Sequence, residues 1–290
     1  MSRVYSALQQ AELENEARTT KQETAELHGE LFEMVSTEAS WLDDATLLRP
    51  VPRPESRLVT IAEHNSLAAE KFRVLKTRLR HLQQKEELKT VLITSASAGE
   101  GKTMVASNLA VSLARNTSQR VLLLEGDLRH PALASEFGLR DPRGITEWFE
   151  NKDSLSRFVY RVEGLRLWFL PAGASVVDPL KILQSARFTE GVNDLAPAFD
   201  WIVIDAPPLM PLADVHVLAA LADGLVLVVR QGKAPKKALA KGLSGLDEAK
   251  VLGVVFNDAQ AIEPGDCDQY YAQQGSVDKT ENGSGREVAR

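Results

Sequence analysis

One eight-residue segment has the residue types and the spacing needed to bind a triphosphate. Residues 96–103, ASAGEGKT, follow a short apolar run and precede a helix-like segment. Glycines at positions 99 and 101 let backbone N–H groups turn toward phosphate oxygens. Lys102 supplies a cation for the β- and γ-phosphates, and the Thr103 hydroxyl can ligate Mg²⁺. We predict a Mg-nucleoside triphosphate site here, with ATP as the expected nucleotide. The expected contacts come from Ala98, Gly99, Glu100, Gly101, Lys102, Thr103 and Met104.

Carboxylates follow two further apolar runs. Residues 122–129 read LLLEGDLR, so Glu125 and Asp127 lie on the same side of an extended chain. Residues 202–208 read IVIDAPP, and the prolines after Asp205 cannot continue strand pairing. Ligands bind at the carboxyl edge of parallel sheets, where one carboxylate could hold Mg²⁺ and another could accept a proton. Each run alone also fits a turn after a strand, but the three motifs in this order point to nucleotide chemistry.

The elements that must position these motifs alternate between apolar β-prone runs and helical segments. Strands are expected at 91–94, 121–124, 165–170, 201–204, 224–229 and 251–256, and helices at 102–116, 178–195, 213–221 and 236–248. A basic amphipathic helix is expected over 61–84. This alternation predicts an α/β fold, a three-layer P-loop NTPase domain with a mostly parallel sheet, over residues 58–258.

The flanking segments and the composition exclude several classes of protein. Residues 1–57 are acidic and end in a proline cluster, which predicts an N-terminal helical extension and a Pro-rich linker. Residues 259–290 are polar and predict a flexible C-terminal tail. A net charge of -6 argues against nucleic acid as a partner. The sequence contains no secretory signal or spanning run, and the lone Cys267 fits a reducing cytoplasm.

Together the three motifs resemble those of the bacterial tyrosine kinases (BY-kinases) of polysaccharide export and capsule synthesis, and the resemblance covers residues 66–257. That family pairs a Walker A loop with an acidic-x-Asp-x-Arg motif, here 125–129, and with a Walker B motif ending in Asp-x-Pro-Pro, here 205–208. The resemblance implies that Lys102 binds phosphate, that Glu125 is a candidate base, and that Arg129 contacts the nucleotide. It also implies the Mg²⁺-associated groups Thr103, Asp127 and Asp205. Asn257 lies where related folds contact adenine, although an Asn there also fits a simple strand-ending turn.

The resemblance further implies partners and a location. In this family a Glu-x-x-Arg-x-x-Arg motif serves ring-like self-association, and this chain has Glu70, Arg73 and Lys76 there. Neighbouring subunits phosphorylate C-terminal tyrosines, for which Tyr270 and Tyr271 are the candidates. The implied protein is a homo-oligomeric tyrosine autokinase that a membrane-embedded chain-length regulator docks and activates. It would be cytoplasmic and peripheral to the inner face of the plasma membrane through that partner.

Two departures from the family pattern keep other functions open. The family usually has Asp at position 125, and a misplacement of about an ångström can cost on the order of a hundredfold in rate. Glu125 therefore leaves open a nucleotide-binding scaffold without transfer activity. MinD/ParA-type switch ATPases carry a signature lysine where this chain has Ser97, which counts against a hydrolytic switch. A basic stretch could face anionic lipid or a partner's tail, but a solvated helix face explains it as well. The stretch contains Lys233, Lys236, Lys237 and Lys241.

Overall fold

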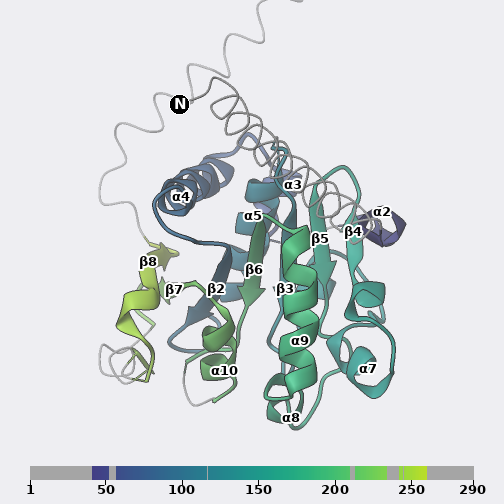
Figure 1. The fold of residues 1–290 in the computed structure, drawn as a ribbon. Helices are drawn as coiled ribbons and strands as arrows, with labels where there is room; N and C mark the ends of the chain where they lie inside the picture. The colour runs from purple at the N-terminus through teal and green to yellow at the C-terminus, as the bar shows by residue number, and fades with distance from the viewer. Residues whose placement is uncertain are drawn as a thin grey trace, which may run out of the picture.

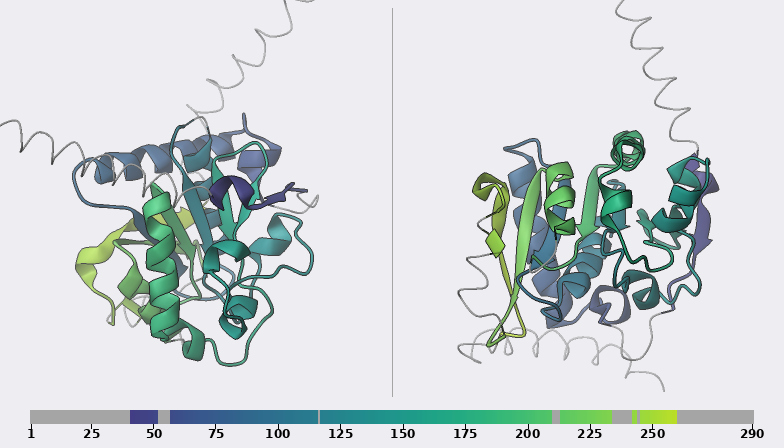
Figure 2. Two further views of the ribbon diagram at one scale, coloured as in Figure 1. Left: turned by 45° about the vertical axis from the view of Figure 1, so that its right-hand side comes forward. Right: turned by 90° about the horizontal axis from the view of Figure 1, so that it is seen from below.

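The computed structural model describes residues 41–51, 57–115, 117–209, 213–233, 242–243 and 245–259. Within them, eight strands form one sheet in the order β1-β4-β5-β3-β6-β2-β7-β8 (Figure 1). Neighbouring strands are parallel except for β4 and β5, which pair antiparallel. The bounds are β1 Thr46–Leu48, β2 Thr90–Ser95, β3 Val121–Glu125, β4 Tyr160–Val162, β5 Leu167–Leu170, β6 Trp201–Asp205, β7 Gly224–Arg230 and β8 Val251–Asn257. Figure 2 shows β8 and β1 at the opposite edges of the sheet.

The central strands β2, β3, β5 and β6 are buried at every position. Both faces of the sheet are covered by helices, which explains why these strands are continuous apolar runs rather than alternating ones. On one face, Leu122 and Leu124 belong to a hydrophobic cluster that includes residues of helices α7 to α10. On the other, Val121 and Leu123 pack in a cluster that includes helices α4 to α6. The predicted three-layer α/β domain with a mostly parallel sheet is confirmed.

The helices have the bounds that follow. They are α2 Trp41–Asp44, α3 Val59–Ala62, α4 Leu67–Gln83, α5 Lys102–Ala114, α6 Leu133–Glu136, α7 Ile145–Glu150, α8 Leu180–Leu183, α9 Ala186–Leu195 and α10 Asp214–Leu221, with 3-10 turns at Leu155–Phe158, Ala196–Ala198 and Glu248–Lys250. Helix α5 is buried along nearly its whole length because it lies between the sheet and α4. Its apolar residues accordingly point in all directions. No helix in the described part of the chain is long and apolar enough to cross a membrane.

Two predicted helices are each divided by a serine cap. The helix expected over 61–84 is split into α3 and α4, because the Ser66 side chain accepts a hydrogen bond from Ala69 N and starts a new helix. The helix expected over 178–195 is split into α8 and α9 in the same way, with Ser185 accepting from Phe188 N. Of the helix expected over 236–248, residues 236–241 and 244 lie outside the described residues, and residues 245–247 are not helical, so the predicted end is wrong.

The sheet also contains two strands that the sequence does not predict, β1 and β4. Each has three residues, which is too short for a periodic pattern to be visible. Strand β1 pairs with β4 and lies within the stretch 1–57 that the sequence assigns to an extension and a linker. This part of the stretch therefore belongs to the folded sheet. Residues 1–40 and the predicted tail from residue 260 onward lie outside the described residues.

Candidate active site

The three motifs meet at the carboxyl edge of the sheet. Strand β6 lies between β3 and β2, and its last residue, Asp205, is in register with Glu125 of β3 and Ile93 of β2. The glycine-rich loop follows β2, and the segment with Asp127 follows β3. Parallel strands thus bring together residues that are about a hundred positions apart in the chain, as the sequence predicts.

The loop that leads into α5 has the backbone shape of a phosphate cradle. Gly99 and Gly101 have φ angles of +76° and +97°, a region that residues with a Cβ rarely adopt. Gly101 is the N-cap of α5, so the free N–H groups of the helix face the loop. The Asn257 side chain donates to Glu100 O at 2.8 Å, and a Cβ at position 101 would lie 2.1 Å from its Nδ2. Glycine at 101 is therefore required by both the backbone and its neighbour.

The Glu100 side chain supports the loop from inside rather than facing a ligand. It is fully buried, and its Oε1 accepts a hydrogen bond from Ser97 N at 2.9 Å. Lys233 Nζ lies over the same loop and donates to Gly99 O at 3.3 Å. Contacts from Glu100 to a nucleotide are thus limited to its backbone. The loop-supporting role of this carboxylate was not predicted, because it depends on the folded path of the loop.

Lys102 is held between two carboxylates. Its Nζ donates to Asp127 Oδ2 at 2.9 Å and lies 3.7 Å from Asp205 Oδ1. Burial lowers the pKa of Lys102, but the surrounding carboxylates, Asp205 foremost, outweigh it and the pKa is raised. Burial raises the pKa of Asp205 to about 6, although Lys102 opposes the shift. The lysine is therefore charged and able to bind phosphate, and two carboxylates face it.

The residues present fit a Mg²⁺ ion that is shared with a nucleotide. Asp205 Oδ1 is buried and has no hydrogen-bond partner within the described residues, so one acceptor is available. Thr103 follows Lys102, and its hydroxyl lies 3.3 Å from Lys102 Nζ, next to Asp127 and Asp205. Within the described residues no group of three or more His, Cys, Asp or Glu could hold a metal alone. Mg²⁺ usually binds one or two carboxylates together with phosphates and water, so this donor set suits a nucleotide-bound ion.

Glu125 is placed differently from the prediction. Its Oε1 accepts hydrogen bonds from Ala132 N at 2.6 Å and Leu133 N at 2.5 Å, and its Oε2 accepts from Ala172 N at 3.0 Å. Burial raises the pKa of Glu125 to about 7, even though the three backbone donors act in the opposite direction. The carboxylate fixes the start of α6 and the end of β5. Its role as the base for a tyrosine hydroxyl stays a prediction, and in this structure the carboxylate accepts three backbone hydrogen bonds.

Arg129 is likewise occupied by a partner that the sequence did not indicate. Its Nε and Nη2 donate to the two carboxylate oxygens of Asp214 at 2.7 and 3.2 Å, and its Nη1 donates to Val177 O. Asp214, the first residue of α10, is 1% exposed, so its charge needs a counter-ion. The nucleotide contact of Arg129 stays a prediction. In this structure the guanidinium joins the loop after β3 to α10.

Of the remaining predicted site residues, some belong to the described part of the chain and others lie outside it. Asn257 lies at the end of β8 against the loop, and its adenine contact stays a prediction. On α4, Arg73 bonds to Glu70 and to His64 O, and Lys76 points inward to carbonyls of α5. Lys76 is therefore engaged within its own chain. Outside the described residues lie Tyr270, Tyr271, Lys236, Lys237 and Lys241.

A phosphate-cradling loop before a buried helix, with acidic groups at neighbouring strand ends, defines a P-loop nucleotide-binding protein. No family model matches the chain. The chain is 33% identical over 207 residues to tyrosine-protein kinase YwqD of Bacillus subtilis strain 168, covering 71% of this chain and 87% of that protein. It is 31% identical over 175 residues to tyrosine-protein kinase CpsD of Streptococcus pneumoniae serotype 4, covering 59% and 77%.

Solved structures agree with these relatives. The VpsO kinase domain is 31% identical and has a TM-score of 0.59, covering 67% of this chain and 100% of that one. The chimerical protein CapA2B2 shares the fold at 24% identity, with a TM-score of 0.66, covering 79% and 99%. The chain belongs to the bacterial tyrosine-protein kinase family, the BY-kinases.

Proposed function

We propose that this chain is an ATP-dependent protein-tyrosine autokinase of exopolysaccharide or capsule assembly. The observation that carries the proposal is the placement of Lys102 between Asp127 and Asp205 at the end of a glycine-rich loop. The names of the relatives YwqD and CpsD support tyrosine as the acceptor. The proposed acceptors are Tyr270 and Tyr271 of a neighbouring subunit.

The proposed reaction is an in-line displacement on the γ-phosphorus of ATP. The bond from this phosphorus to the β–γ bridging oxygen breaks, and a bond to the tyrosine oxygen forms, which leaves ADP. Lys102 exchanges its carboxylate partners for phosphate oxygens and neutralises charge on the transferred group. The loop N–H groups and the start of α5 orient the phosphates. Thr103 and Asp205 would hold Mg²⁺ when it is bound, and the ion would offset the negative charge of the phosphates.

The tyrosine hydroxyl must lose its proton during transfer, and two carboxylates face Lys102. Asp205 Oδ1 lacks a hydrogen-bond partner in the described residues and suits the metal. Asp127 Oδ1 accepts a hydrogen bond from His130 N and Asp127 Oδ2 accepts one from Lys102 Nζ, so Oδ2 becomes free when Lys102 binds phosphate oxygens instead. We assign proton acceptance to Asp127 and a supporting role to Glu125, whose carboxylate is occupied by backbone donors.

The proposed partners follow from the family and from one solved structure. The CapA2B2 chimera, by its name, joins two Cap components, which supports a separate activating partner for this chain. We assign that role to the cytoplasmic segment of a membrane-embedded chain-length regulator, which would bring this kinase to the inner face of the membrane. Self-association would present the tail tyrosines of one subunit to the site of the next.

One experiment separates this function from its competitors. The chain is incubated with γ-labelled ATP and Mg²⁺, with and without a candidate activating segment. Wild type is compared with Lys102→Met and with a Tyr270→Phe/Tyr271→Phe double variant. Label on wild type that disappears in both variants is the expected result. Free phosphate without labelled protein would indicate a hydrolytic switch, and ATP binding with neither product would indicate a scaffold.

A further inference from the structure

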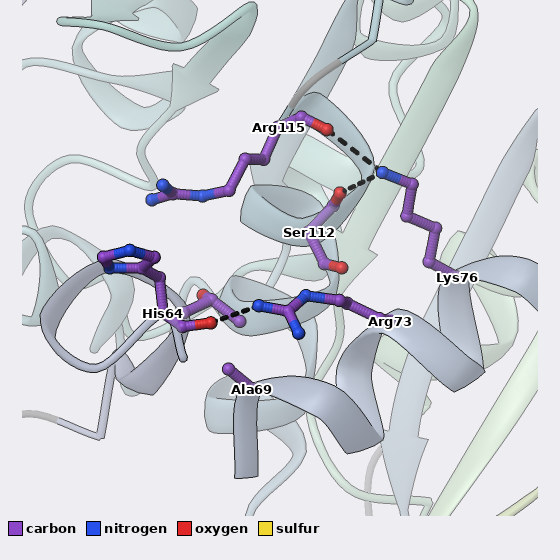
Figure 3. Close-up of a pocket in the computed structure, with 7 residues that line it drawn as sticks. His64, Ala69, Arg73, Lys76, Ser112 and Arg115 are labelled. Atoms are coloured by element: carbon purple, nitrogen blue, oxygen red, sulfur yellow. Dashed lines mark hydrogen bonds between the residues drawn. The ribbon is translucent and has the colours of Figure 1, made fainter. Parts of the chain in front are cut away.

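A cavity of about 90 Å³ lies between helix α4 and the C-terminal end of helix α5 (Figure 3). Its walls include His64, Arg73, Lys76, Ser112 and Arg115. Helix α5 has 13 residues and rises about 1.5 Å per residue, so the cavity is about 20 Å from the glycine-rich loop at the other end. The cavity is therefore separate from the nucleotide site.

Three cationic side chains line this cavity, and one of their buried donors has no hydrogen-bond partner among the described residues. Lys76 Nζ donates to Ser112 O at 2.8 Å and to Arg115 O at 3.1 Å, which leaves a third N–H. Arg73 uses part of its five-donor fork on Glu70 and on His64 O. Arg115 Nε is buried and has no hydrogen-bond partner among the described residues. A buried charged donor without an acceptor costs free energy, which a bound anion would recover.

The charged side chains around the cavity are mostly basic. Arg73, Lys76 and Arg115 line it, whereas the carboxylate found beside them is that of Glu70, which pairs with Arg73. Burial lowers the pKa of Lys76, and repulsion from Arg80 and Arg73 lowers it further. Burial and the neighbouring arginines thus both disfavour the charged form of Lys76. An anion in the cavity would reverse this penalty.

We propose that the cavity binds an oxyanion of the phosphate class, either free inorganic phosphate or the phosphoryl group of a small molecule such as O-phosphotyrosine. Its volume suits this ligand, because a single water needs about 10–15 Å³ of the same measure and the cavity holds several times that. The guanidinium fork of Arg115 matches phosphate oxygens in pairs, and its fixed charge does not depend on pH. The Ser112 hydroxyl, which also lines the cavity, can add a neutral donor.

The test titrates phosphate into the full-length protein by calorimetry while saturating Mg-ADP fills the glycine-rich loop. Inorganic phosphate and O-phospho-L-tyrosine are compared in separate titrations, and the tighter ligand identifies the source of the phosphoryl group. We expect one site per chain. Arg115→Gln should weaken binding by about tenfold or more, because charge-assisted hydrogen bonds are lost, and Arg115→Lys should weaken it less.

The matched control is Arg78→Gln, which removes an exposed arginine of helix α4 that does not line the cavity. It should leave the affinity unchanged, and thermal melts of each variant check folding. The proposal is overturned if neither ligand binds the ADP-saturated wild type. It is also overturned if folded Arg115→Gln binds as tightly as Arg78→Gln.

Discussion

The two ends of helix α5 each hold a desolvated lysine in opposite electrostatic surroundings. Lys102 begins the helix, and burial lowers its pKa less than Asp205 and Asp127 raise it. Lys76 caps the other end, where burial and then Arg80 and Arg73 all lower its pKa. One end therefore offers a charged lysine among carboxylates, which suits a triphosphate with a divalent cation. The other end has excess positive charge, which suits an anion alone.

The largest effect is expected from removing Lys102, which lies among carboxylates at the start of helix α5. Lys102→Met should lower the rate of autophosphorylation by about 10²–10³-fold, the cost of losing a donor that stabilises transition-state charge. Initial rates of label incorporation measure it. Lys85→Met removes an exposed lysine and is the matched control, with an unchanged rate. Undiminished label in Lys102→Met would show that the site is assigned wrongly.

The two carboxylates after β3 should differ sharply in function. Asp127→Asn should lower the transfer rate by about 10²-fold, because a general base contributes about 10²–10⁴. Glu125→Gln keeps an acceptor for Ala132 N and Leu133 N, so its rate should stay within a few-fold of wild type. Single-turnover kinetics compare the two. The reverse order of effects would restore Glu125 as the base.

The buried carboxylates Glu125 and Asp205, near the start of helix α5, should make folding stability depend on pH. The pKa of Glu125 is raised from 4.5 to about 7 and that of Asp205 from 3.8 to about 6, so the folded state holds these protons more tightly than the unfolded chain. The associated stability is present in full below about pH 4 and is lost as pH rises toward 7. Urea midpoints should therefore fall across this window in wild type and fall less in Glu125→Gln. A steeper fall in the variant would contradict the assignment.

The smallest effect is expected from removing Lys76, which lies at the C-terminal end of helix α5. Lys76→Met removes the two hydrogen bonds to carbonyls at the end of α5, which should lower the free energy of unfolding by about 1–2 kcal/mol. ADP affinity should be unchanged, because the loop is at the other end of the helix. Analytical ultracentrifugation of the same variant tests the family's self-association motif. A change in oligomer size without a loss of stability would mean that Lys76 acts between subunits.

The sequence predicts the sheet and the gathering of the motifs because both depend on local patterns. Continuous apolar runs indicate buried parallel strands, and strand ends of a parallel sheet meet at one edge whatever lies between them. Lys102, Asp127 and Asp205 are consequently found together as predicted.

What the sequence could not predict depends on contacts between distant segments. The Glu125 carboxylate accepts a hydrogen bond from Ala172 N, 47 residues further along, and the Arg129 guanidinium is held by Asp214, 85 residues away. Lys76 points inward because the end of α5 offers it carbonyls, 36 and 39 residues away. No spacing rule within a motif contains this information. The roles of such residues follow only from the packed structure.

The most direct test of the proposed activity is the ratio of phosphotyrosine to free phosphate produced from Mg-ATP in one incubation. Mass spectrometry locates and counts phosphotyrosine on the chain, and a phosphate assay follows hydrolysis in the same sample, with Lys102→Met as the inactive reference. We expect phosphotyrosine at Tyr270 or Tyr271 that exceeds free phosphate and is absent from Lys102→Met. Steady release of phosphate without any phosphotyrosine would contradict it.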